Sequence, residues 1–282
     1  MLLATELIKA IDIVLEEEQE SSFRWHLGAS VIGKECAREI YYSYRWAKTI
    51  EFEGRMLRLF DRGHREEERF IGWLRAVGAT VWDRTPDGKQ LRVPSAVSGH
   101  FGGSKDGVAL NIPGVEQPVY LLTEFKTHND KSFKNLVKNG VEESKPAHFI
   151  QMQVYGGLSE LPLALYLAIN KNDDALHAEL IPIVPEVLHN TVLRATTIIT
   201  SNRPPQRISN SPSFYKCKFC DFSPVCHKKE LPAVNCRTCN YSRPVENGDW
   251  YCSAFSFLLT KDIEEQAHNG CSAHSFIPAL IE

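Results

Sequence analysis

The sequence has 282 residues, of which 43% are hydrophobic and 24% charged, a composition typical of a soluble globular protein. This length accommodates one large domain, or one domain with a small appendage. No apolar run approaches the roughly 20 residues that cross a bilayer, and the acidic N-terminus lacks the basic and apolar regions of a signal peptide, so we expect a cytoplasmic protein without membrane contact. The net charge of −3 neither favours nor excludes a nucleic-acid partner, because positive charge can be concentrated locally.

Hydrophobic periodicity predicts three helices in the first part of the chain. We expect an amphipathic helix over residues 4–20, a second over 37–47 that begins near Cys36, and a long one over 54–77. In the long helix the residues at helical spacing are Leu57, Phe60, His64, Ile71 and Leu74. They share one face, so His64 is expected to point toward the interior.

A strand-rich stretch follows. Residues 79–82 and 91–93 are short strand candidates, and the glycines between 97 and 112 indicate a hairpin. The strongest strand pattern covers 119–127, and 163–170 is typical of a buried strand. Helices are expected over 131–139, 146–159 and 185–200. This order predicts an α/β core, and we place a boundary near Leu231 and Pro232, giving domains 1–231 and 232–282.

Two carboxylates and a lysine are the first candidate site. Side chains alternate along a strand, so Glu124 and Lys126 share one face while Phe125 points to the other and can pack. Asp106 lies at a glycine-rich strand end that can run beside Glu124. Converging carboxylates repel each other unless a cation neutralises them, and hard oxygen ligands suit Mg²⁺ or Mn²⁺.

Such a site has a defined chemistry. The metal supplies Lewis acidity at a phosphate, and Lys126 can orient a metal-held water and help to deprotonate it. Taken alone, an E-x-K triplet is more often a surface ion pair or a solvated face. The order of its companions along the chain, His64 before it and Gln151 and Tyr155 after it, favours the catalytic interpretation.

Gln151 and Tyr155 are four residues apart in a predicted helix and therefore share a face. An amide and a phenol placed there can bond to a phosphate, a base edge or the catalytic lysine. The alternative is a helix face with polar tips.

At this point the chain resembles a known family. The series His64, G-x-x-D ending at Asp106, E-x-K at 124–126 and Q-x-x-x-Y at 151–155 resembles the RecB-type branch of the PD-(D/E)xK nucleases. The resemblance covers about residues 25–230 and implies a restriction-endonuclease-like core, with a mixed central sheet flanked by helices. Cys36 and C-x2-C-x5-C resemble the iron–sulfur subgroup, which contains the CRISPR-associated RecB-like exonucleases.

The resemblance implies roles for the matching positions. The metal would be held by His64, Asp106, Glu124 and the backbone carbonyl of Phe125. Lys126 would position the attacking water, and a nitrogen ligand would shift the preference toward Mn²⁺. Substrate-side roles fall to Gln151, Tyr155 and Lys145, and a solvated side chain is the alternative for Lys145.

The resemblance also implies a cluster that closes the core. Cys217, Cys220 and Cys226 need a fourth ligand, and Cys36 supplies it in the family resembled. Cysteine thiolates are the usual ligands of a [4Fe–4S] cluster. Zinc also accepts four cysteines and is the competing interpretation, and free structural thiols are the third.

A second cysteine quartet lies in the tail, outside the family core. It consists of Cys236, Cys239, Cys252 and Cys271. A C-x2-C knuckle followed by two separated cysteines is typical of a zinc-ribbon-like site, which would fold a tail too small to hold a core alone. The last spacing is long, so His268 or His274 is an alternative ligand to Cys271.

We therefore expect a metal-dependent DNA nuclease, an exonuclease on single-stranded or end-containing DNA in phage, recombination or CRISPR-type DNA processing. Its cofactors would be Mg²⁺ or Mn²⁺, a [4Fe–4S] cluster and a structural Zn²⁺. A protein partner or homo-oligomer remains open. One alternative is a catalytically silent DNA-end-binding iron–sulfur subunit of a repair complex, and another is a redox protein centred on the cluster.

Overall fold

The structure, a computed structural model, describes residues 2–19, 23–116 and 118–282. Its main helices are α1 (Leu2–Glu17), α3 (Ala37–Tyr44), α4 (Gly54–Ala76), α5 (Asp130–Ser144), α6 (Pro146–Leu158) and α7 (Pro185–Thr200). Shorter helices are α2 (Ala29–Ile32), α8 (Tyr215–Lys218), α9 (Ser223–His227) and α10 (Glu264–Asn269). No helix in these ranges is long and apolar enough to cross a membrane.

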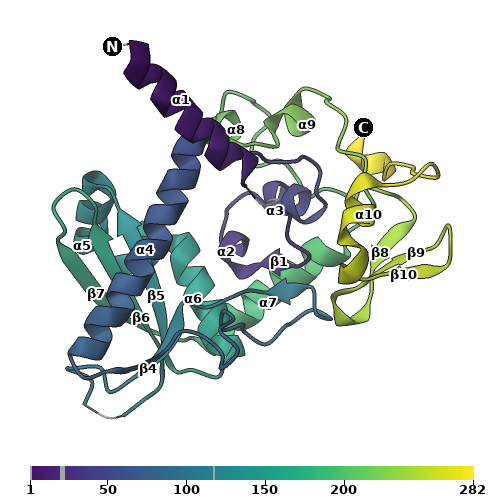
Figure 1. The fold of residues 1–282 in the computed structure, drawn as a ribbon. Helices are drawn as coiled ribbons and strands as arrows, with labels where there is room; N and C mark the ends of the chain where they lie inside the picture. The colour runs from purple at the N-terminus through teal and green to yellow at the C-terminus, as the bar shows by residue number, and fades with distance from the viewer. Residues whose placement is uncertain (1, 20–22, 117) are drawn as a thin grey trace.

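A five-stranded mixed sheet lies at the end of the molecule opposite the strands of the C-terminal tail (Figure 1). Its order is β2 (Thr80–Trp82), β4 (Gly107–Leu110), β5 (Leu121–His128), β6 (Leu163–Asn170) and β7 (Leu176–Pro182). Only β5 and β6 pair in parallel, and the other neighbours are antiparallel. The parallel pair requires a crossover, which α5 and α6 provide. The expected α/β core with a mixed sheet and flanking helices is confirmed.

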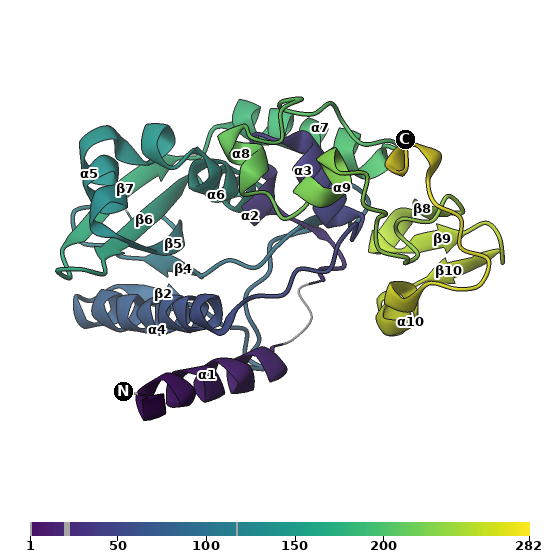
Figure 2. The same ribbon diagram turned by 90° about the horizontal axis from the view of Figure 1, so that it is seen from above.

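Helices cover both faces of this sheet (Figure 2). Alternate residues of β5 and β6 point to opposite sides. Phe125, Leu165 and Ile169 belong to one apolar cluster with Phe70 of α4, whereas Ala164, Tyr166 and Ala168 belong to the other, with α6 and α7. Helix α1 contacts α4 and lies on its outer side, away from the sheet (Figure 2). The sheet is therefore the middle layer of the core.

Most predicted elements are confirmed, with shifted ends. The long helix predicted over 54–77 is α4, and the strand predicted over 163–170 is β6. The first helix ends at Glu17, and residue 20, its predicted end, lies outside the described residues. Strand β7 was not predicted, because its exposed and half-buried alternation is the weak pattern of a sheet edge.

Two strand predictions were wrong. Residues 91–93 form no strand, only an isolated bridge between Arg92 and Ser104. The hairpin predicted over 97–112 is absent, because its two strands have other partners. Strand β3 (Phe101–Gly102) pairs in parallel with β1 (Leu27–Gly28), and β4 lies between β2 and β5. The glycines that indicated a turn instead allow close backbone approach: Gly99, with φ +88°, faces the backbone of Gly248.

The C-terminal tail carries its own three-stranded antiparallel sheet. It is formed by β8 (Ser242–Pro244), β9 (Trp250–Cys252) and β10 (Phe257–Leu259) and lies at one end of the molecule (Figure 2). Trp250, Leu259 and Ile277 join the same apolar cluster as residues of α3 and α7. The division into domains 1–231 and 232–282 stays a prediction, and a continuous apolar core crosses its boundary.

One buried arginine fastens the tail to the N-terminal part of the core. Arg237 is 1% exposed, and its guanidinium carbon lies 3.8 Å from the ring centroid of Trp46. It donates from Nη1 to the carbonyl of Tyr44 at 2.9 Å and from Nη2 to that of Trp25 at 2.5 Å. A planar, multiply donating cation suits this aromatic and carbonyl-lined socket.

We predict that Arg237→Ala lowers the free energy of unfolding by about 3 kcal/mol or more, because it leaves buried carbonyls without donors and opens a cavity among aromatic rings. Arg243→Ala, an exposed change in β8, is the control and should change it by less than about 0.5 kcal/mol. Urea denaturation followed by tryptophan fluorescence measures both. Equal effects of the two substitutions would contradict the assigned role.

Candidate active site

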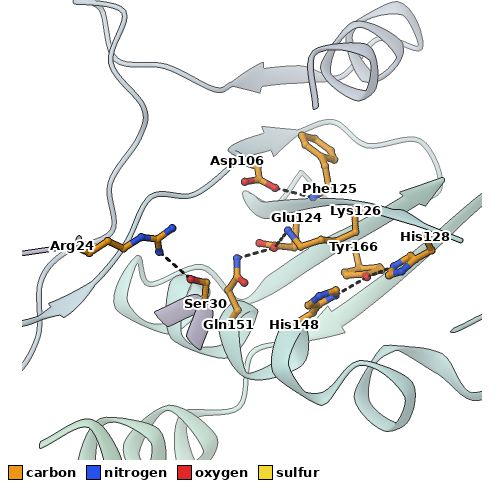
Figure 3. A network of polar contacts seen from close by, with 10 residues as sticks. All are labelled: Arg24, Ser30, Asp106, Glu124, Phe125, Lys126, His128, His148, Gln151 and Tyr166. Carbon is orange, nitrogen blue, oxygen red and sulfur yellow. Dashed lines mark hydrogen bonds and ion pairs between the residues drawn. The ribbon is translucent and has the colours of Figure 1, made fainter. Parts of the chain in front are cut away.

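Strand β5 carries the central polar groups (Figure 3). Glu124 and Lys126 point to one face and form an ion pair, and Phe125 points to the other, where its ring stacks on Phe70 at a centroid distance of 5.2 Å. The predicted alternation is confirmed. Gln151 of α6 donates from Nε2 to Glu124 Oε1 at 2.7 Å, so one carboxylate oxygen joins the strand to the helix that covers it.

Asp106 reaches the same point from the neighbouring strand. Gly107 of β4 pairs with Thr123 of β5, which brings Asp106 and Glu124 to the next position along the two strands. Asp106 Oδ2 accepts a hydrogen bond from the backbone N–H of Phe125 at 2.9 Å (Figure 3). The chain thus gathers Asp106, Glu124, Lys126 and Gln151 at the place where β4 and β5 separate.

The Glu124 carboxylate lies in an environment that disfavours its charged form. Its side chain is fully buried, and Oε2 has no hydrogen-bond partner in the described part of the chain. Burial raises the pKa of Glu124 to about 7, and the charges of Asp106 and Glu67 add to this, although Lys126 opposes it. Burial disfavours the charge of Lys126, but Glu124 and Asp106 outweigh it and raise the Lys126 pKa above its usual value.

A cavity of about 850 Å³ opens beside these residues. Phe125, Lys126 and Thr127 of β5, His64 and Glu67 of α4, and His148 of α6 lie in its wall. Asp106 and Glu124 are not among its lining residues, so Lys126 stands between the cavity and the buried carboxylate. Of the ion pair, therefore, Lys126 and not Glu124 lines the cavity.

The expectation that His64 points into the interior was wrong. His64 is exposed and faces the cavity, since only the C-terminal part of α4, with Phe70, Ile71 and Leu74, packs on the sheet. The N-terminal part extends past the sheet, where the same helical face meets open space. The exposure of Phe60, 39%, has the same origin.

Glu67 is a further site residue that the sequence did not reveal. It lies one helical turn after His64, and burial raises its pKa to about 7, with an added contribution from the charge of Asp106. The run Glu66, Glu67, Glu68 hid it, because only the packing of α4 decides which of the three glutamates line the cavity. Glu66 also lines the cavity, but it pairs with Arg69.

The substrate-side residues of the prediction lie on α6 or at its start. Gln151 is buried on Glu124, and Tyr155 packs against Gly103, where an added Cβ would meet the ring at 2.9 Å. Both thus face the sheet, as their four-residue spacing indicated. Lys145 is half-buried and donates from Nζ to Ser132 Oγ at 2.8 Å, away from Glu124.

The donor set partly fits a divalent cation. Two carboxylates at one strand separation, a third nearby and an unpartnered buried oxygen on Glu124 are what a hard cation would satisfy. Within residues 2–19, 23–116 and 118–282, however, no three His, Cys, Asp or Glu side chains are arranged closely enough to hold a metal ion. In this arrangement Lys126 is the partner of Glu124.

The first cysteine quartet is gathered by the fold. A small cavity is lined by Cys36, Cys217, Cys220 and Cys226. Cys36 is the residue before α3, and the other three lie in and around α8 and α9. Burial raises the pKa of the Cys220 thiol to about 11, and the charges of nearby acidic groups, including Cys36, contribute.

The second quartet is gathered in the same way in the tail. Another small cavity is lined by Cys236, Cys239, Cys252 and Cys271. Burial and the neighbouring thiols raise the pKa of Cys236 to about 11. His274 also lines this cavity, whereas His268 packs between Phe23 and Trp46, with ring centroids 4.1 Å from each. All eight cysteines are free thiols. In the described part of the chain, the thiols of neither quartet are arranged closely enough to hold a metal ion.

Comparison with known proteins gives only weak similarities. No family model matches the chain, and no curated protein does. The crystal structure of LHK-Exo in complex with dAMP is 14% identical, with a TM-score of 0.46, over 62% of this chain and 86% of that one. The structure of SSO0001 is 16% identical, with a TM-score of 0.45, over 82% and 98%.

A further structure, that of an alkaline exonuclease (LHK-Exo) from Laribacter hongkongensis, is 16% identical, with a TM-score of 0.43, over 63% of this chain and 87% of that one. At these TM-scores and identities the similarities carry no argument about function. The geometry of the site is therefore the only basis for a functional assignment.

We predict that Gly103→Ala destabilises the protein by about 1–3 kcal/mol, because the new methyl group would overlap Tyr155. Gly72→Ala is the control: nothing lies within 4 Å of its added Cβ on α4, so it should stabilise by about 0.5–1 kcal/mol. Urea denaturation measures both. A neutral Gly103→Ala would show that Tyr155 is not held against this backbone.

Proposed function

We propose that this protein is a metal-dependent DNA nuclease that hydrolyses phosphodiester bonds, acting as an exonuclease on single-stranded or end-containing DNA. The observation that carries the proposal is the convergence of Asp106, Glu124 and Lys126 where β4 and β5 separate, beside a large cavity. A purely structural ion pair needs neither the second carboxylate nor the unpartnered Glu124 oxygen. DNA processing of the phage, recombination or CRISPR type is the expected context.

The metal would be Mg²⁺ or Mn²⁺, held by Asp106, Glu124 and the Phe125 carbonyl with His64, and when bound it supplies Lewis acidity at the phosphate. Glu67, which faces the same cavity, is an additional candidate for this donor set. Burial, with repulsion from Asp106 and Glu67, raises the pKa of Glu124, and a bound cation would offset both effects.

Lys126 acts from the cavity side. Its raised pKa keeps it an ammonium, so it orients the attacking water by hydrogen bonding and stabilises negative charge on the phosphate. Gln151 holds Glu124 Oε1 in place through its amide. Tyr155, on the same helix α6, packs that helix against the Gly103 backbone. Lys145 stays a candidate phosphate contact.

We predict that Lys126→Ala and Asp106→Asn each lower cleavage by about 10²–10³-fold or more, because Lys126 acts on the water and the phosphate and Asp106 would hold the metal. End-labelled single-stranded and duplex DNA, labelled at either end, with Mn²⁺ or Mg²⁺, measures this and the polarity together. Circular dichroism checks the fold.

Lys89→Ala is the matched control, since that lysine is exposed and paired only with Asp87. Its activity should equal that of the wild type. Full activity of Lys126→Ala would refute the assigned role. Tight binding of DNA ends without cleavage by the wild type would instead favour the silent end-binding subunit.

We further propose a [4Fe–4S] cluster at Cys36, Cys217, Cys220 and Cys226, and a structural Zn²⁺ at Cys236, Cys239, Cys252 and Cys271. Four free thiols facing one small cavity support each site. Because His274 faces the second cavity and His268 does not, His274 is the alternative ligand that the packing favours. Binding requires the thiols to move into coordination distance.

Anaerobically purified protein should contain about four iron atoms and one zinc ion per chain. Cys217→Ser should lose iron and keep zinc, and Cys239→Ser should lose zinc and keep iron. Elemental analysis and visible absorption measure this. A colourless protein with zinc at the first quartet would overturn the cluster assignment.

A further inference from the structure

A chain of hydrogen bonds lies behind the cavity wall, next to Lys126 (Figure 3). The Tyr166 hydroxyl of β6 is its centre. It bonds to His128 Nε2, at the end of β5, at 2.8 Å and to His148 Nδ1, on α6, at 2.9 Å. Tyr166 is fully buried and is the β6 register partner of Glu124. His148 was named above only as part of the cavity wall, and neither histidine has yet been given a role.

The far end of the chain is a cation. Ser132 Oγ lies 3.2 Å from His128 Nδ1, and Lys145 Nζ donates to that same Oγ at 2.8 Å. An ammonium can only donate, so Ser132 must accept from it. The single Ser132 hydroxyl proton is then satisfied by donation to His128 Nδ1.

We assign the direction of the remaining bonds from this end, taking the Ser132 hydroxyl as the donor to His128 Nδ1. With Nδ1 accepting, neutral His128 carries its proton on Nε2 and donates it to Tyr166. Tyr166 has one proton, which it donates to His148 Nδ1. His148 therefore carries its own proton on Nε2. The reverse direction would leave the Ser132 proton without an acceptor among the described residues, and the tautomers are assigned on that basis.

His148 Nε2 is the outer end of the chain. His148 lines the same cavity as Lys126 and Thr127, and Nε2 makes no hydrogen bond to any residue in the described ranges. Burial, with the charges of Lys126, His128 and Lys145, lowers the His148 pKa to about 3, so the ring is neutral. The cavity therefore receives one oriented, uncharged N–H donor beside an ammonium.

We propose that His148 is a phosphate-binding residue, whose Nε2–H donates to a phosphate oxygen of the nucleic-acid strand while Lys126 engages the reacting phosphate. The proposal rests on the proposed nuclease function. A phosphodiester is the ligand that fits the part of the wall where His148 and Lys126 lie, because it offers only acceptor oxygens and one negative charge to a neutral donor and a cation. Tyr166, His128, Ser132 and Lys145 are positioning residues, since they act through His148.

The first test compares His148→Ala with His148→Gln. Loss of a hydrogen bond to a charged oxygen should lower kcat/KM for DNA cleavage about 10–100-fold in His148→Ala. His148→Gln should recover much of this, because its amide nitrogen can occupy the place of Nε2. His189→Ala, an exposed histidine on α7, is the control and should leave cleavage unchanged. Equal activity of His148→Ala and the wild type would overturn the proposal.

A second test probes the chain itself. Tyr166→Phe removes the donor that fixes the His148 tautomer, so it should lower kcat/KM, but only when His148 is present. The double variant Tyr166→Phe/His148→Ala should be no less active than His148→Ala alone. Additive losses would overturn the positioning role, and thermal unfolding of each variant separates it from a loss of stability.

Failure of this proposal and failure of the proposed function are distinguishable. Binding of a short fluorescent single-stranded oligonucleotide is measured in parallel, with Asp106→Asn as the background. If the wild type does not cleave DNA but binding weakens about 10-fold or more in His148→Ala, the nuclease function fails and the phosphate contact stands. If binding does not depend on His148, the phosphate contact is refuted whatever the wild type's activity.

Discussion

A carboxylate without solvent needs hydrogen-bond donors or a cation, and the arrangement of the core follows from how Glu124 meets that need. Lys126, two residues on along the same strand, pairs with it, and Gln151 of α6 donates to the same oxygen. The second oxygen stays without a partner. β5 and α6 must therefore keep their mutual position, since a buried charge that loses its partners is strongly destabilising.

Two apolar clusters, one on each face of the sheet, hold these elements in place. Phe125 stacks on Phe70 on one face of β5, while Tyr166 and Ala168 pack under α6 on the other. The sheet cannot shift its register by one residue without moving Phe125 into the polar site and Glu124 into the aromatic contact. At the opposite end of the molecule Arg237 fixes the tail to the backbone of Tyr44 and Trp25, so the tail contributes to the same packed body.

The electrostatics of the site have two sides. Asp106, Glu124 and Glu67 concentrate negative charge near Lys126. Burial, with the neighbouring carboxylates, raises the pKa of both glutamates. On the other side, His128 and His148 bond to the Tyr166 hydroxyl, and Lys145 lies beyond His128. Burial, with nearby positive charge, lowers the pKa of both histidines, so both imidazoles are neutral. Lys126 lies between the two groups. A metal cation would bind on the carboxylate side of Lys126, and a phosphate on the histidine side.

The sequence by itself determined the periodic features. It predicted α4 and β6, the opposite orientations of Phe125 and the Glu124–Lys126 pair, the shared face of Gln151 and Tyr155, and the grouping of the cysteines into two sets. The helix and strand features depend on residue types at helical or strand spacing, which local geometry alone enforces. The cysteine sets depend on motif spacing and, for Cys36, on the family resemblance. Only the tertiary structure decided the rest. His64 is exposed because α4 extends past the sheet. β3 and β4 separate because each finds another strand to pair with. Glu66 and Glu67 line the cavity while Glu68 does not. The series of hydrogen bonds that runs from Lys145 through Tyr166 to His148 joins residues from two strands and two helices. No spacing encodes such contacts, because they depend on where the end of one element falls against another.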